Sequence, residues 1–321
     1  MGKNISVKSE ENQSNLSFFQ GNIPVIAVSG AIRSFGGGFV TTYVSLYFVE
    51  LGGNTLMLGL MGSTALLVQC IVLILGGIIA DYYGRRRIMV LTAFYGVFFP
   101  LLYGVIRDWR LFAALSVMAA IGAISTPASH ALVVDSIPPE KRTTGIASLQ
   151  VLSSLPTIVS PLVAGWLIQN HGLLDGFRLG CTYAAATALA SALIVFLFLR
   201  ETLRPRLAKS DFLNLGKIVS FMKPQGPLPT SLKALLGSYA LVTFANGAVG
   251  QYYIVYANRV IGLTPLEWGI ITSLQILLLS VLKIPGGWLS DKFGKRKVMI
   301  ISVLTCAPCT CLLYTSDAAD E

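Results

Sequence analysis

Charged residues are scarce in this sequence: Asp, Glu, Lys and Arg make up 12% of its 321 residues, whereas 54% are hydrophobic. A soluble domain carries roughly 25% charged residues, and a water-soluble chain of this length could not bury so much apolar surface. We therefore expect lipid to be the solvent for most of the chain. Alternating strands of about 10 residues are also lacking, which excludes a membrane barrel and leaves helices as the spanning elements.

Patterns that carry catalysis or bind metals are missing as well. The sequence contains no His-Glu-x-x-His helix and no Gly-x-Ser-x-Gly turn with a partner histidine. Cys306 and Cys309 have the spacing of a redox pair, but no thioredoxin-like pattern surrounds them. We therefore expect no enzyme, no metal and no cofactor. The first 22 residues also lack the apolar core of a signal peptide.

Long apolar runs are what the sequence does contain. Each complete run reaches or exceeds the ~20 residues that a helix needs to cross ~30 Å of hydrocarbon. The fold class is therefore an all-α membrane protein embedded in a lipid bilayer. We expect eight spanning helices and part of a ninth, which begins near 298; the eight lie at about 24–48, 56–80, 88–106, 111–135, 146–169, 177–199, 234–257 and 266–290.

The net charge of +9 is divided between the two sides of the membrane. With the N-terminus in the cytoplasm, 18 of the 24 Lys and Arg residues fall in cytoplasmic segments, and four fall outside: Arg107, Arg110, Arg178 and Arg259. This positive-inside bias predicts a multi-pass protein of the cell membrane with a cytoplasmic N-terminus. Nucleic-acid binding would need the cations on one continuous face, and we do not expect it.

A ten-residue pattern occurs twice, as Gly77 to Arg86 and as Gly287 to Arg296. The offset of 210 residues (291 minus 81) holds without a gap over a longer stretch, with Gly37, Tyr43, Gly52, Gly59 and Ser63 matching Gly247, Tyr253, Gly262, Gly269 and Ser273. A duplicated membrane bundle is typical of secondary transporters built from two structural repeats.

The repeat and the apolar runs predict five parts of the chain. They are a cytoplasmic tail (1–22), a first six-helix bundle (23–199), a cytoplasmic linker (200–233), a partial second bundle (234–310) and a short end (311–321). The last eleven residues resemble the translation of a transposase adapter used in sequencing libraries. We therefore interpret the chain as a fragment truncated near its C-terminus.

The twice-occurring pattern Gly-x-x-x-Asp-x-x-Gly-(Arg/Lys)-Arg resembles the signature loop of the major facilitator superfamily, which joins helices two and three and, by symmetry, helices eight and nine. The resemblance covers about 23–300. It implies two pseudo-symmetric six-helix bundles in a monomer. It also implies transport of a small solute by rocker-switch alternating access, with or without a co- or counter-transported proton.

Each residue of the first motif has a physical reason. Gly77 lets a neighbouring helix pass close to the backbone, and Asp81 can accept hydrogen bonds from the amides that open the next helix. Gly84 permits the positive φ of a short turn. Arg85 and Arg86 supply donors for a carboxylate partner.

Asp135, at the cytoplasmic end of helix four, is the partner that we expect for these arginines, and the resemblance implies the same charge relay. Such a cluster can hold one face of a transporter shut and release it. The alternative, a loop that merely obeys the positive-inside rule, explains the arginines but not the aspartates and glycines. The second copy supplies Gly287, Asp291, Gly294, Lys295 and Arg296.

A second resemblance lies in helix five, where Ser160 to Gly165 is similar to the Gly-Pro-x-x-Gly-Gly element of family exporters. Pro161 and Gly165 match that element, whereas Ser160 and Ala164 replace glycines. This favours efflux of a drug or metabolite. The antiporter subgroup carries an arginine inside helix four, and its absence here argues against drug–proton exchange.

Ionisable groups inside a membrane are costly and mark functional sites. Arg33 is about nine residues, or ~13 Å, into helix one, where it could bind an anionic solute or a carboxylate, or bond the carbonyls near Gly36, Gly37 and Gly38. His130 is a candidate proton carrier because imidazole exchanges protons near neutral pH; a neutral packing histidine is the alternative.

Further polar candidates for the solute cavity are Tyr43, Asn246, Gln251 and Tyr253, with aromatic packing as the alternative for the tyrosines. No Asp or Glu lies mid-helix in the first eight spans, so a carboxylate proton carrier is not evident. The leading hypothesis is an exporter. The alternatives are an importer of anions, organic acids or sugars that uses Arg33, and a non-transporting relative that acts as a sensor or assembly partner.

Overall fold

The computed structural model describes residues 21–137, 142–202, 229–294, 296–302 and 304, and within these ranges the chain is helical and contains no strand. It forms two compact units, Met1–Ser273 and Leu274–Glu321. The helices are α2 (Asn22–Glu50), α3 (Thr55–Tyr83), α4 (Arg85–Val105), α5 (Trp109–Ala119), η2 (Ala120–Ser125), α6 (Thr126–Ser136), α7 (Arg142–His171), α8 (Leu173–Phe198), α11 (Thr230–Val249), α12 (Tyr253–Arg259) and α13 (Pro265–Phe293).

Eight helical spans in the described residues are long and apolar enough to cross a membrane, which confirms the eight that the sequence predicts. The fourth is not continuous: α5 and α6 are separated by the 3₁₀ segment η2. Pro127, which lies in the first turn of α6, has no N–H to donate and disfavours a regular α-turn before it. The seventh span is also interrupted, between α11 and α12.

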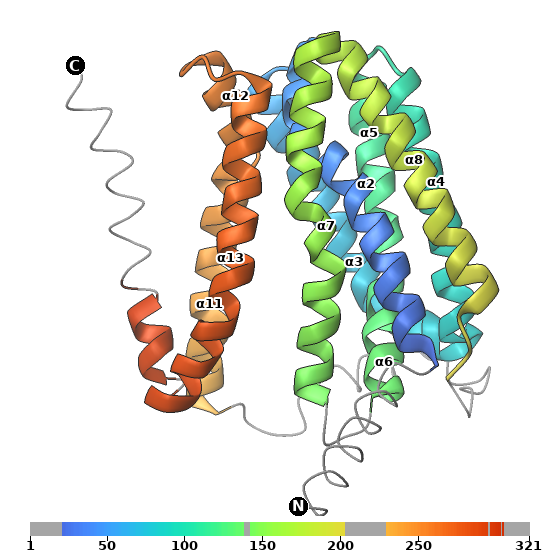
Figure 1. Ribbon diagram of the computed structural model, residues 1–321, viewed down its shortest axis with the longest axis vertical. Coiled ribbons are helices and arrows are strands. Elements are labelled where there is room, and N and C mark those ends of the chain that lie inside the picture. The colour runs from blue at the N-terminus through green and yellow to red at the C-terminus, as the bar shows by residue number, and fades with distance from the viewer. Residues whose placement is uncertain (1–20, 138–141, 203–228, 295, 303, 305–321) are drawn as a thin grey trace, which may run out of the picture. The chain divides into compact units, whose positions relative to one another are not determined.

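In the first unit, α2 packs against α7 and α8, and α8 packs against α4 (Figure 1). The core is an aromatic cluster where α2 and α4 end and where α5 and α8 begin. The Tyr47 and Phe177 rings stack with centroids 4.1 Å apart, and the Tyr103 and Phe112 centroids are 4.6 Å apart. Each such pair contributes about 0.5–1.5 kcal/mol beyond the area that it buries. We call the end of the bundle that holds the aromatic cluster the far end. The opposite end, which holds the first motif, is called the motif end.

The internal repeat is visible in the backbone. The positive-φ glycines Gly52 and Gly84 (φ 95° and 99°) lie 210 residues before Gly262 and Gly294 (φ 80° and 88°). Helix caps follow the same offset: the Asn54 side chain accepts from the Met57 amide, and Thr264 forms a reciprocal capping box with Glu267. The turns before α3 and α4 are therefore built like the turns that lie 210 residues later in the chain.

The domain boundaries that the sequence predicts stay a prediction. Of the linker, residues 203–228 lie outside the described residues, as do the N-terminal tail to residue 20 and the short end 311–321. The start of the linker is held in place. The Asn22 side chain donates to the Arg200 carbonyl at 2.9 Å and accepts from the Arg200 amide at 2.8 Å, so the first residue of α2 is bonded to the segment after α8.

Candidate functional site

The centre of the first motif is an ion-pair cluster at the motif end. Arg85, at the start of α4, donates through Nη1 to Asp135 of α6 and lies 3.4 Å from Asp81 of α3 through Nη2. The Arg85 side chain is 13% exposed, whereas the two carboxylates are 45% and 42% exposed. Asp135 is thus in contact with the arginine that the sequence pairs with it. One largely shielded guanidinium connects three helices.

Asp81 does not play the capping role expected for it. It lies within the last turn of α3, which continues to Tyr83, and its carboxylate meets Arg85 one turn later. Helix α4 begins at Arg85, and no side chain caps its N-terminus, which follows Gly84. Gly84 itself has φ 99°, so the positive φ expected of this glycine is present.

The close helix approach expected at Gly77 occurs one residue earlier. A Cβ added at Gly76 would lie 2.4 Å from the Ile124 carbonyl oxygen in η2, whereas a Cβ at Gly77 would meet only the Pro127 Cβ, at 3.8 Å. The reason is rotation, because adjacent helical residues point about 100° apart. Gly76 faces η2 directly.

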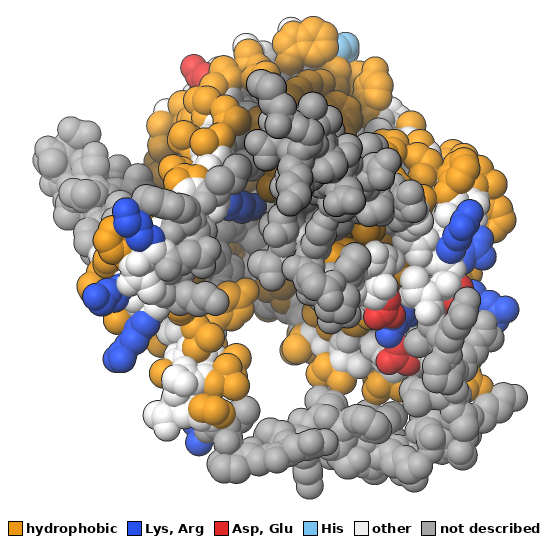
Figure 2. Space-filling view, turned by 60° about the horizontal axis from the view of Figure 1, so that its bottom comes forward, with side chains coloured by type: hydrophobic (Ala, Val, Ile, Leu, Met, Phe, Trp, Pro, Cys, Tyr) orange, Lys and Arg blue, Asp and Glu red, His pale blue; other side chains and the backbone are white. Residues whose placement is uncertain are grey.

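Arg86 bonds backbone rather than a carboxylate through its side chain. Its Nε donates to the Leu199 carbonyl at 2.5 Å and its Nη2 to the Phe196 carbonyl at 2.7 Å, while the Glu201 carboxylate accepts from the Arg86 amide at 3.1 Å. Arg86 therefore caps the C-terminus of α8, where carbonyls lack partners within the helix. No sequence signal beyond the motif itself indicates this role. Figure 2, tilted toward the motif end, shows Asp and Glu side chains close to Lys or Arg side chains on one part of this face, with hydrophobic side chains on the flanks.

The second copy of the motif belongs to the second unit. Gly287 and Asp291 lie within α13, but the structure does not describe their side chains, and Lys295 lies outside the described residues. Gly294 has φ 88°, and Arg296 is exposed. The gating role predicted for this copy stays a prediction.

The helix-five element forms a tight junction at the far end. Pro161 and Ser160 are fully buried, and the Ser160 hydroxyl donates to the Phe35 carbonyl of α2 at 2.5 Å. A Cβ at Gly165 would lie 2.5 Å from the Pro265 carbonyl oxygen and 2.7 Å from the Tyr43 hydroxyl. Small residues here let α2, α7 and the start of α13 approach one another closely.

Tyr43 belongs to this junction rather than to a cavity. Its side chain is fully buried, and its hydroxyl lies 3.2 Å from the Pro161 carbonyl and 2.7 Å from the Pro265 carbonyl, with one proton to donate. The packing alternative therefore describes its position. Its repeat partner Tyr253 is half-exposed in α12.

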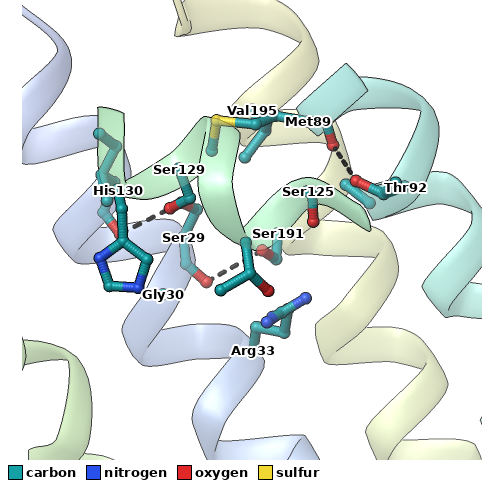
Figure 3. Close-up of a pocket in the computed structure, with 13 residues that line it drawn as sticks. Ser29, Gly30, Arg33, Met89, Thr92, Ser125, Ser129, His130, Ser191 and Val195 are labelled. Carbon is teal, nitrogen blue, oxygen red and sulfur yellow. Dashed lines mark hydrogen bonds between the residues drawn. The ribbon is translucent and has the colours of Figure 1, made fainter. Parts of the chain in front are cut away.

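Arg33 and His130 line one polar cavity of about 210 Å³ (Figure 3). We call it the polar cavity. Residues of α2, α4, α8 and the η2–α6 segment surround it, and six of them carry hydroxyls: Ser29, Thr92, Ser125, Thr126, Ser129 and Ser191. All belong to the first repeat, and Arg33 and His130 are themselves exposed. The carbonyls of Gly37 and Gly38 accept from Thr41 and Thr42 instead of from Arg33.

The remaining candidates lie elsewhere. Gln251 packs its amide on Gly62 of α3 and lines two cavities of about 470 and 480 Å³. Its Oε1 is buried and has no hydrogen-bond partner among the described residues. Asn246 is exposed and donates to the Val242 carbonyl of its own helix. The structure therefore does not bring these polar candidates together into one site.

Comparison with known protein families identifies the class. The model of the Major Facilitator Superfamily matches residues 26–264 and 235–319, and the chain therefore belongs to this superfamily. Multidrug resistance protein MdtG of Yersinia enterocolitica serotype O:8 / biotype 1B is 23% identical over 289 residues, which cover 84% of this chain and 66% of the relative. MdtG of Salmonella typhi is 24% identical over 281 residues, which cover 83% of this chain and 65% of the relative. The chain thus spans just under two thirds of the length of these relatives.

Solved transporter structures share the fold. A bacterial homologue of the human lysosomal transporter Spinster, in an inward-facing and occupied conformation, matches with a TM-score of 0.60 and 19% identity, covering 85% of this chain and 62% of that one. The nucleoside transporter NupG matches with a TM-score of 0.62 and 13% identity, covering 87% and 71%. At these identities the likeness shows the all-α fold and no more. The family match and the eight spans of the described residues indicate a multi-pass membrane protein.

Proposed function

We propose that this chain is part of a secondary transporter of the efflux type, which moves a small solute across the cell membrane by alternating access. The observation that carries the proposal is the Arg85 cluster with Asp81 and Asp135 at the motif end. The multidrug resistance relatives and the small residues of the helix-five junction support efflux as the direction of transport. The motif end faces the cytoplasm in this proposal, because the positive-inside bias places it there.

The strength of the cluster suits a reversible gate. Both carboxylates are more than a third exposed, so solvent screening reduces each pair to about 1 kcal/mol. A charge-assisted hydrogen bond to the shielded Arg85 raises the total to about 1–3 kcal/mol. Such an energy biases two conformations by roughly 5- to 150-fold without making either inaccessible. The cluster therefore holds α3, α4 and α6 together as one body that can be released.

Contacts at the far end support closure on that side. Arg259 of α12 pairs with Glu50 of α2 at 2.8 Å, and the Tyr252 hydroxyl donates to the Thr55 carbonyl at 3.1 Å. These contacts join the first repeat to α12 of the second repeat within the first unit. In the proposed orientation, the far end is the outer face, and these two contacts are the ones that we propose close it.

The test uses the complete gene, read from its source locus and expressed in a bacterial host that lacks its own drug exporters. We expect Asp135→Asn to lower the rate of dye efflux about tenfold, because the amide cannot neutralise Arg85, and to leave the concentration for half-maximal rate unchanged. Asp108→Asn is the matched control: Asp108 caps α5 at the far end, and Asn caps a helix as well as Asp does.

The outcomes separate the candidate functions. A wild-type efflux rate in Asp135→Asn would refute the gating role of the Arg85 cluster. Solute uptake instead of efflux in right-side-out vesicles would favour the importer alternative, for which the supporting observation is Arg33 in the wall of the polar cavity. Absence of flux for every solute class would favour the non-transporting alternative. Proton coupling, with His130 as carrier, predicts a flux that responds to the pH gradient in wild type and not in His130→Gln.

A further inference from the structure

The polar cavity adjoins a second cavity inside the first bundle. This second cavity has a volume of about 390 Å³ and shares Arg33 and Ala93 with the polar cavity. Its wall is formed largely by small and apolar side chains, among them Val40, Gly96, Pro100, Ala184 and Ala188; we call it the apolar cavity. Together the two volumes fall within the roughly 300–1,000 Å³ of ligand sites, and Arg33 lies where they meet.

Arg33 has no counter-ion among the residues that the structure describes. Its guanidinium forms no hydrogen bond or ion pair with any residue that the structure describes, and no acidic residue is among those that line either cavity. An arginine within a membrane span is costly unless it meets a partner or water. Its planar fork is shaped to bind a carboxylate, sulfonate or phosphate through two parallel hydrogen bonds. A bound anion would supply the missing charge.

The hydroxyls of the polar cavity can turn toward such an anion. Ser29, Thr92 and Ser125 donate to carbonyls three or four residues earlier in their own helices, at 3.3, 2.8 and 3.2 Å. These bonds duplicate what the helix already satisfies, so their loss to a ligand costs little. Ser191 instead donates to the Ser29 carbonyl at 2.9 Å and holds α8 against α2. The close-up shows Arg33 beside Ser191, and His130, which belongs to α6, stands apart from Arg33 on another side of the cavity (Figure 3).

The apolar cavity sets the other half of the ligand. A Cβ added at Gly96 or at Gly37, which both line this cavity, would meet no atom within 4 Å. An apolar group placed there would gain contacts that the empty space lacks. Arg33 lies between the polar cavity, which suits a charged group, and the apolar cavity, which suits a hydrophobic group. A purely inorganic ion would fill only the first of these, so an organic anion fits the two cavities better.

We propose that the two cavities form one binding site for an amphiphilic organic anion. Its charged group binds Arg33 and the surrounding hydroxyls, and its apolar group fills the space beside Gly96. The assignment of this ligand as the transported substrate rests on the proposed function; its binding does not. The site lies within one bundle, so the present chain, without transport, is sufficient to test it.

The experiment is equilibrium dialysis of the purified chain in neutral detergent with labelled 4-phenylbutyrate, its neutral amide and acetate. We expect the acid to bind at least tenfold more tightly than the amide and than acetate. Arg33→Gln should weaken binding of the acid at least tenfold, whereas Arg87→Gln, the same charge change on an exposed side chain outside both cavities, should leave it unchanged. Arg33→Lys keeps the charge without the fork and should give a smaller loss.

A second variant tests the apolar half. Gly96→Leu should fill the apolar cavity and reduce the affinity for 4-phenylbutyrate to that for acetate, with acetate binding unaffected. Equal binding of acid and amide, or an Arg33→Gln chain that binds like Arg87→Gln, would overturn the proposal. So would unchanged 4-phenylbutyrate affinity in Gly96→Leu. If Arg33→Gln does not fold, the Arg33→Lys and Gly96→Leu results decide. Failure here leaves the Asp135 gate untouched, and failure of the gate leaves this binding result standing.

Discussion

Two adjacent glycines in α3 should respond in opposite ways to the same substitution. In Gly76→Ala the new methyl group would lie 2.4 Å from the Ile124 carbonyl oxygen and 3.1 Å from both the carbonyl carbon and the Cα of Ile124. All are backbone atoms of η2, so no side-chain rotation relieves the contact. In Gly77→Ala the nearest atom is the Pro127 Cβ, at an ordinary 3.8 Å.

The magnitude follows from comparing the two variants. Both replace glycine by alanine in the same helix, so the gain in helix propensity of up to about 1 kcal/mol is common to both and cancels. What remains is overpacking at Gly76, which costs about 1–3 kcal/mol. Reversible unfolding of the detergent-solubilised chain should therefore show Gly76→Ala to be less stable than Gly77→Ala by about that amount.

Equal stabilities would refute the reasoning, because they would mean that α3 and η2 do not cross at Gly76. The reverse order would place the close contact at the motif glycine, Gly77. A double variant offers a control: the Gly77→Ala effect should add to that of Gly76→Ala, since Gly77 contacts different atoms.

Two other contacts give matched tests. Arg86→Lys should loosen the end of α8, because one ammonium group cannot reach both the Leu199 and the Phe196 carbonyls as the guanidinium does. Deuterium exchange at residues 196–202 should therefore be faster in Arg86→Lys than in the control Arg87→Lys. Equal exchange rates would contradict the capping role of Arg86. Gly165→Ala should have a lower melting temperature than Gly237→Ala. A Cβ at Gly165 would lie 2.5 Å from the Pro265 carbonyl oxygen, whereas a Cβ at Gly237 would meet nothing within 4 Å. Equal melting temperatures would argue against the tight helix-five junction.

The spanning helices were predictable because bilayer thickness alone fixes the length of an apolar run. The interruption in the fourth span was not predicted, although Pro127 carries a signal for it. The motif pointed to Arg85 and Asp135, since opposite charges at the same membrane face have few other partners. It could not decide between Gly76 and Gly77, because only the packed angle of α3 determines which of them faces η2.

The surroundings of Arg33 show the limit of a linear pattern. Its depth in helix one is read directly from the sequence, but the direction of its side chain depends on how four segments pack. Ser191 is 158 positions away, and no spacing rule links it to Arg33. Tyr43 shows the same limit in the opposite case. Its hydroxyl suggested a residue of the solute cavity, but packing buries the side chain between α7 and α13.

The two ends of the first unit are held by different kinds of force, and this difference bears on which end opens. At the far end, stacked rings such as Tyr47 and Phe177, together with the contacts of Gly165, form an apolar core beside the exposed Arg259–Glu50 ion pair. At the motif end, Arg85 and Arg86 hold the helices through hydrogen bonds and ion pairs that water can replace. Each of those bonds contributes only about 1 kcal/mol when partly exposed, so they can be exchanged one at a time at small cost. A transporter needs one such labile end in each conformation. We therefore expect opening at the motif end to require no loss of apolar core, and the far end to open only when the contacts of α12 and α13 with α2 and α7 are broken together.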